Sequence, residues 1–285
     1  MKYLILVLCG FLSCMKVTIQ GRLARKSIIT TYDSIFANCL VFAFTALIFS
    51  VALGEKIKMD IIGYAALFGV FSASFQIFYA LALKSGPFSI SCLMVNLSMV
   101  LPAVFSVVFL DEKLTVLKVI GVLLCITALV LNTKKDNVKA NFKWFLYVFL
   151  AFLSTGSISI VQKLYAKSPV AGELPQFLFL GYLVAFLITF IFVLAQKVNK
   201  NEGEFKITKS NLMFIFGIVI CLGAFQYFCT MANSFIDAIV LNPSVSGLST
   251  MFLSISGVIV FKEHLSKRQI LSICIGFLAI VLISI

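Results

Sequence analysis

The sequence predicts an all-α membrane protein of ten transmembrane helices, arranged as two inverted five-helix repeats. Its composition is the first reason, because 61% of the 285 residues are hydrophobic and only 12% are charged, against roughly 25% charged in an ordinary soluble domain. The second reason is a series of apolar runs, each near the roughly 20 residues that a membrane crossing needs. The third is that the second half repeats patterns of the first. Ten such spans leave only short links, and no room for a separate soluble domain.

The apolar runs place the spans in chain order. The first five cover about residues 3–20, 34–53, 61–83, 88–110 and 116–131, and the second five cover about 142–161, 174–195, 212–231, 238–261 and 269–285. Charged residues bound the runs, as expected where cations anchor helix ends at lipid headgroups. In order they are Lys2, Arg22, Asp33, Glu55, Asp60, Lys84, Asp111, Lys134, Lys143, Lys163, Glu173, Lys197, Lys209, Asp237, Lys262 and Lys267.

Short motifs recur at matching places in the two halves. Phe11-Leu12-Ser13 returns as Phe152-Leu153-Ser154, and Lys26-Ser27 returns as Lys167-Ser168 at the same spacing. The segment Glu112-Lys113-Leu114-Thr115 has a similar counterpart in Glu263-His264-Leu265-Ser266. We therefore predict one repeat over 1–133 and a second over 134–285. An odd number of spans per repeat inverts the second relative to the first. The first span loosely imitates a signal peptide, but its twin in mid-chain favours its retention.

One half carries the motif of a known family. It runs through Ala82-Leu83-Lys84-Ser85-Gly86-Pro87, Leu97, Pro102, Phe109-Leu110-Asp111-Glu112-Lys113-Leu114-Thr115 and Ile120-Gly121. These residues resemble the repeat of the drug/metabolite transporter superfamily, EamA type. The second half echoes it but has Leu253 in place of the mid-helix proline and Ser272 in place of a glycine. The resemblance implies a ten-helix carrier of small metabolites, with a central cavity and cytoplasmic termini.

Polar side chains inside the spans predict the substrate site, because such groups are costly when they face lipid. The candidates are Lys16, Gln20, Gln76, Asn96, Thr155, Ser159, Gln226, Ser246 and Ser249. Lys16 lies roughly 18 Å into the bilayer, counting from Leu4 at about 1.5 Å per residue. It either snorkels to the interface or faces a cavity, where it would pair with a substrate carboxylate or phosphate. For the hydroxyls, interhelical hydrogen bonding is the alternative role.

The acidic residues all lie at span ends or in links, which leaves no membrane-embedded carboxylate to neutralise a cationic drug. We therefore predict a secondary transporter that moves a small polar metabolite, such as an amino acid, by alternating access. The alternatives are an exporter of drugs or toxic compounds, for which Asp237 would be the key carboxylate, and a non-transporting sensor or scaffold. A lipid enzyme is disfavoured because HxxxxD, HExxH and GxSxG motifs are absent from the sequence. Glu112 and Glu263 each precede a span, where a carboxylate caps a helix N-terminus or serves as a gate or proton site.

The remaining expectations concern partners and location. The eight cysteines fall inside apolar runs without a CxxC pair, and His264 is the one histidine, so we expect no metal and no cofactor. The net charge of +12 is spread over links rather than gathered in a patch, so we expect no nucleic acid. The predicted partners are a small-molecule substrate and the lipid bilayer of the plasma membrane. Excluding Lys16, seven Lys and Arg residues lie on the side of the N-terminus and fifteen on the other. The charge rule thus puts the termini outside the cytoplasm, whereas the resemblance puts them inside.

Overall fold

The computed structural model describes residues 2–27, 31–53, 58–86, 88–132, 141–198, 208–261 and 267–284. Within these ranges the chain is all helical, as predicted. The helices are α1 (Lys2–Ser27), α2 (Thr31–Ser50), α3 (Met59–Ser85), α4 (Phe88–Leu97), α5 (Val100–Phe109), α6 (Val116–Asn132), α7 (Phe142–Ala166), α8 (Leu174–Val198), α9 (Lys209–Ala232), α10 (Ala238–Phe261) and α11 (Lys267–Ser284).

Among the described residues, eight helical segments are long and apolar enough to cross a membrane. They correspond to α1, α2, α3, α4 with α5, α7, α8, α9 and α10. The helix α6 is a shorter apolar helix over Val116–Leu131, and α11 is not among the eight. The predicted count of ten spans therefore stays a prediction.

The fourth predicted span is not one helix but two, because it breaks at Ser98–Met99 between α4 and α5. Pro102 has no N–H to donate to the Ser98 carbonyl, and its ring crowds that carbonyl. The Leu101 N–H donates to the Ser98 carbonyl instead, at 3.0 Å. The Ser98 hydroxyl also donates to the Val95 carbonyl at 2.6 Å, which competes with the regular helical bond. Uniform hydropathy along the run concealed this local break.

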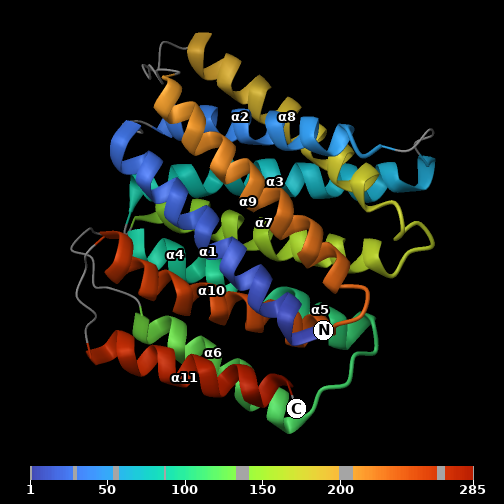
Figure 1. Cartoon of the computed structure of the whole chain (residues 1–285), viewed down its shortest axis with the longest axis vertical. Coiled ribbons are helices and arrows are strands. Elements are labelled where there is room, and N and C mark those ends of the chain that lie inside the picture. Colours follow the sequence, from blue (N-terminus) through green and yellow to red (C-terminus); the bar gives the residue numbers. More distant parts are fainter. Residues whose placement is uncertain are drawn as a thin grey trace.

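The helices run back and forth across one body (Figure 1). The links from α5 to α6, α7 to α8 and α9 to α10 gather at one end of the helices, together with the end of α2 and the start of α3 (Figure 1). Both chain termini lie at that end too (Figure 1). We call it the terminal end. The most extensive helix packing joins α3 with α7, α6 with α11, α2 and α3 with α8, and α1 with α9 and α10.

The largest apolar core lies among α2, α3, α7, α8 and α9, and Phe68, Phe177 and Tyr182 are fully buried in it. Glycine makes the close approach of α3 and α8 possible. A Cβ atom added to Gly69 would lie 2.5 Å from the Gly181 carbonyl oxygen, and one added to Gly181 would lie 2.6 Å from the Phe68 ring. Larger side chains at either position would push the two helices apart.

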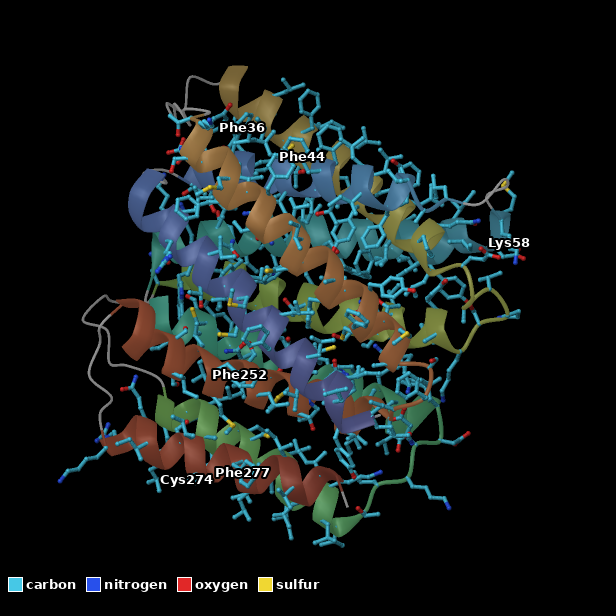
Figure 2. All side chains as sticks on the ribbon, in the orientation of Figure 1. Phe36, Phe44, Lys58, Phe252, Cys274 and Phe277 are labelled. Carbon is cyan, nitrogen blue, oxygen red and sulfur yellow. The ribbon has the colours of Figure 1, made fainter. Side chains whose placement is uncertain are left out.

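The pair α6 and α11 lies at the edge of the body, beside α10 (Figure 1). The Ser272 hydroxyl donates to the Ala128 carbonyl at 2.7 Å, which ties the two helices together. On the other side of α11, Phe277 is 63% exposed and points away from the body (Figure 2). Exposed aromatic and aliphatic side chains on this face fit contact with lipid hydrocarbon rather than with water.

Candidate functional site

The nine predicted site residues all lie in described helices, but they differ in how far they are already engaged. Asn96 is exposed, Gln76 is 8% exposed, and the other seven are partly exposed. Three of the nine side chains already form hydrogen bonds with other residues of the chain. The Thr155 hydroxyl donates to the Ala151 carbonyl of its own helix at 2.9 Å, Ser249 donates to Ser13 at 3.1 Å, and Gln226 accepts from Gln162.

For these three residues the structure favours the packing role over a free ligand-binding group, as expected for many hydroxyls in spanning helices. The side chains of Lys16, Gln20, Gln76, Asn96, Ser159 and Ser246 make no hydrogen bond or ion pair with any residue that the structure describes. Their assignment to a substrate site stays a prediction.

The lysine of α1 is placed by its helical neighbours. Ser13, one turn before Lys16, bonds to Ser249 of α10, and Ile19, three residues after it, lies against Gly217 of α9. Because residues three apart share a helix face, Lys16 projects between these two contacts. The side chain is therefore turned toward α9 and α10 and away from the exposed face that carries Phe11. This placement favours the interior over snorkelling.

A compact amide cluster joins α7 to α9. The Gln162 Nε2 donates to the Gln226 Oε1 at 2.7 Å and to the Thr230 Oγ1 at 2.7 Å. Gln162 is 2% exposed and Thr230 is 1% exposed, whereas Gln226 is partly exposed. Paired in this way, the amides escape most of the penalty of burying polar groups.

The adjacent residue of α7, Lys163, forms a buried ion pair with Glu112 of the α5–α6 link. Its Nζ lies 2.9 Å from the Glu112 Oε1, and the two side chains are only 5% and 4% exposed. Lys163 also donates to the carbonyls of Asn233 at 3.1 Å and Ile236 at 2.8 Å, both in the α9–α10 link. Glu112 in turn accepts the Ala238 N–H at 2.9 Å, at the start of α10. We call this arrangement the Glu112–Lys163 clasp.

Local backbone geometry aims Glu112 at its partners. Asp111 adopts a left-handed conformation with φ 54°, which a short polar residue tolerates better than most. The chain thereby turns at the end of α5, and the Glu112 N–H donates to the Ser106 carbonyl at 3.2 Å. Burial by itself raises the pKa of Glu112, but the hydrogen bonds and charge of Lys163 and the Ala238 N–H outweigh it. The net pKa is lowered from 4.5, so the carboxylate is ionised at neutral pH.

The clasp corrects two expectations from the sequence. Glu112 does cap a helix, but that helix is α10 rather than the one that follows it in the chain. The carboxylate is buried among its partners. Lys163 is not a cation of a link, because α7 continues to Ala166, five residues beyond the predicted end at 161. A signal was available: Lys163 continues the face of Thr155 and Ser159 at intervals of four. Glu263, the predicted counterpart of Glu112, lies outside the described residues.

Two further ion pairs lie at the same terminal end. Lys118 meets Asp237 at 3.2 Å, and Lys58, labelled at that end in Figure 2, meets Glu173 at 2.8 Å. Both are more exposed than the clasp, with Asp237 48% and Lys58 53% exposed. Asp237 lies in a link and is paired with Lys118, so it does not provide a membrane-embedded carboxylate for a cationic drug.

Two cavities among the described residues lie away from the predicted polar site. The larger is an apolar groove of about 280 Å³ between α2 and α9, lined by Ile48, Phe49, Val219, Ile220, Gly223, Ala224 and Tyr227. The smaller, of about 10 Å³, lies between α6, α10 and α11. Neither is lined by any of the nine predicted residues. The described residues also form no cluster of His, Cys, Asp and Glu suited to a metal ion.

Comparison of the sequence with known protein families identifies the family of this chain. The EamA-like transporter family matches residues 1–134 and again 142–285. The chain belongs to this family. It is thus a multi-pass membrane protein of the drug/metabolite transporter superfamily, and the family consists of transporters rather than enzymes.

Two individual proteins are similar to this EamA-like chain. An uncharacterized protein from Haemophilus influenzae (strain ATCC 51907 / DSM 11121 / KW20 / Rd) is 31% identical over 190 residues, which cover 65% of this chain and 62% of that protein. A crystal structure of another protein superposes with a TM-score of 0.73 over 97% of this chain and 95% of the other, at 14% identity. At that identity, the second likeness concerns the fold alone.

Proposed function

We propose that this EamA-like protein is a secondary transporter that moves a small polar metabolite, such as an amino acid, by alternating access between two inverted repeats. Membership of the EamA-like transporter family is the observation that carries the proposal. The substrate and the mechanism go beyond that membership. They are supported by the packing of the helices and by the polar groups that the interior leaves unengaged.

Helix packing supports the inverted repeat and its ten spans. In the proposed repeat, the helices α1, α2, α3, α4–α5 and α6 correspond, in that order, to α7, α8, α9, α10 and α11. A packing contact between two helices should then recur between their two counterparts. The structure packs α3 on α7 and likewise α1 on α9, and it packs α1 on α10 and likewise α7 on α4 and α5. Two helices pack on their own counterparts, α2 on α8 and α6 on α11. The two separate family matches agree with the same division near residues 133 and 134.

The unpaired lysine supports a substrate with a negative group. Lys16 is turned toward α9 and α10, and its ammonium has no counter-ion among the described residues. A charge inside a span is costly unless it is paired, so a carboxylate or phosphate on the substrate would stabilise it. Gln20 lies on the same face one turn further on, where its amide supplies both a donor and an acceptor. An amino acid zwitterion offers a carboxylate to Lys16 and further polar groups to Gln20.

Flux through proteoliposomes tests the proposal. Purified protein is reconstituted, and uptake or exchange is measured against a panel of radiolabelled amino acids, carboxylates and sugar phosphates. Saturable flux of at least one compound is expected, and Lys16→Met should weaken an anionic or zwitterionic substrate more than a neutral one. Lys143→Met is the matched control, because that lysine lies on the exposed surface of α7. Absence of saturable flux across the panel would contradict transport, and equal weakening of both substrate types would make Lys16 structural.

A further inference from the structure

The clasp is the densest polar contact between the two parts of the chain that match the family. Glu112 belongs to the first match and Lys163, Asn233, Ile236 and Ala238 belong to the second. One carboxylate thus joins the α5–α6 link to both the end of α7 and the start of α10. A buried ion pair held in this way is not needed for stability alone, since apolar residues of similar size often stabilise a core as well.

An apolar cluster lies directly beside the clasp. It is formed by Ile5, Leu6 and Cys9 of α1, Cys229 and Ala232 of α9, Ile236 of the link, and Leu241 and Val245 of α10. We call it the terminal-end cluster. Cys9 and Cys229 are 0% and 7% exposed within it. Like the clasp, it joins a helix of the first match, α1, to helices of the second.

The clasp and the terminal-end cluster share the α9–α10 link. Lys163 holds the carbonyl of Ile236, whose side chain packs into the cluster, and Glu112 holds the N–H of Ala238 two residues later. The α9–α10 link is therefore fixed from both sides. If the two matched parts of the chain separate at this end, the cluster and the clasp must both open, because each joins the first match to the second.

We infer that the Glu112–Lys163 clasp is the latch of a gate that closes the terminal end, with the terminal-end cluster as its apolar seal. The inference rests on the proposed transport function. Opening at this end separates the Glu112 carboxylate from Lys163 and exposes Cys229. The charges of the pair hold the latch shut, whereas the Lys58–Glu173 pair at the same end is more exposed and lies outside the terminal-end cluster.

Alkylation of the native cysteines tests the latch without any substrate. The purified protein, in detergent micelles, is treated with N-ethylmaleimide, and modification of each cysteine is followed by peptide mass spectrometry. Glu112→Gln removes the charge but keeps an acceptor for α10, and Lys163→Gln keeps a donor for the link carbonyls. Each variant should raise the alkylation rate of Cys229 by about tenfold, the effect of shifting an equilibrium by about 1.4 kcal/mol.

Two controls sharpen the result. Glu173→Gln removes a charge from the exposed pair with Lys58 and should leave the rate at Cys229 unchanged. Cys39, 2% exposed in α2 and outside the terminal-end cluster, reports general unfolding and should stay unmodified in every variant. An unchanged rate at Cys229 in both clasp variants would overturn the inference. A joint rise at Cys229 and Cys39 would also overturn it, because the clasp would then hold the whole fold rather than a gate. If the unmodified protein shows no saturable flux in proteoliposomes but the clasp variants selectively expose Cys229, the transport proposal fails and the latch stands.

Discussion

Removing Glu112 should destabilise the protein more than removing its partner Lys163. In Glu112→Ala the Lys163 ammonium stays buried with only two carbonyls to bind, and the N–H of Ala238 loses its acceptor. Breaking a buried pair by deleting one partner costs about 3–5 kcal/mol. In Lys163→Met the carboxylate keeps the N–H groups at the start of α10, where the helix dipole favours an anion by up to about 2 kcal/mol. The expected loss is then about 1.5–3 kcal/mol, that of a hydrogen bond to a charged group.

A double-mutant cycle separates the pair from its surroundings. The variant with both changes leaves no unpaired charge, so its loss should be smaller than the sum of the two single losses by about 0.5–3 kcal/mol. The free energy of unfolding is measured by denaturant titration in detergent micelles. Fluorescence of Trp144, the one tryptophan and 7% exposed, reports the transition. Additive losses, or equal losses in the two single variants, would refute the assigned roles of the pair.

Two other changes test the fold and its titration. Gly69→Ala should destabilise by about 1–3 kcal/mol by overpacking α3 against α8, whereas Gly63→Ala, at a position with no atom within 4 Å, should be neutral or slightly stabilising in the same unfolding measurement. Because the pKa of Glu112 is lowered from 4.5 in the folded protein, its ionised form contributes stability above that pH. Thermal stability should fall as pH drops through the lowered pKa, and Glu112→Gln should remove that part of the dependence.

The sequence was sufficient to predict the helical membrane architecture, since composition and apolar runs report directly on the solvent that a chain meets. The boundaries were less certain because an apolar window ends at the first charge, even when the helix continues. At the end of α7 this placed Lys163 in a link, although it pairs with Glu112 inside the fold. The break between α4 and α5 follows from Pro102, a local steric effect that mean hydropathy does not register.

Which polar groups engage one another could not be read from the sequence, because that depends on how helices far apart in the chain align. Gln162 and Gln226 are 64 residues apart, and their side chains meet only because α7 and α9 converge near the terminal end. Periodicity could place each amide on the polar face of its helix. It could not tell an amide that bonds a neighbouring helix from one that has no partner, such as Gln76, among the described residues.

The engaged and unengaged groups are unevenly distributed between the halves, and this bears on the state of the molecule. On α7, Lys163 forms an ion pair with Glu112, and Gln162 donates hydrogen bonds to Gln226 and Thr230. On α1, the helix that the proposed repeat pairs with α7, Lys16 and Gln20 lie at other positions along the helix and have no partner that the structure describes. The difference fits a carrier closed at the terminal end, with the polar groups of α1 left for a ligand.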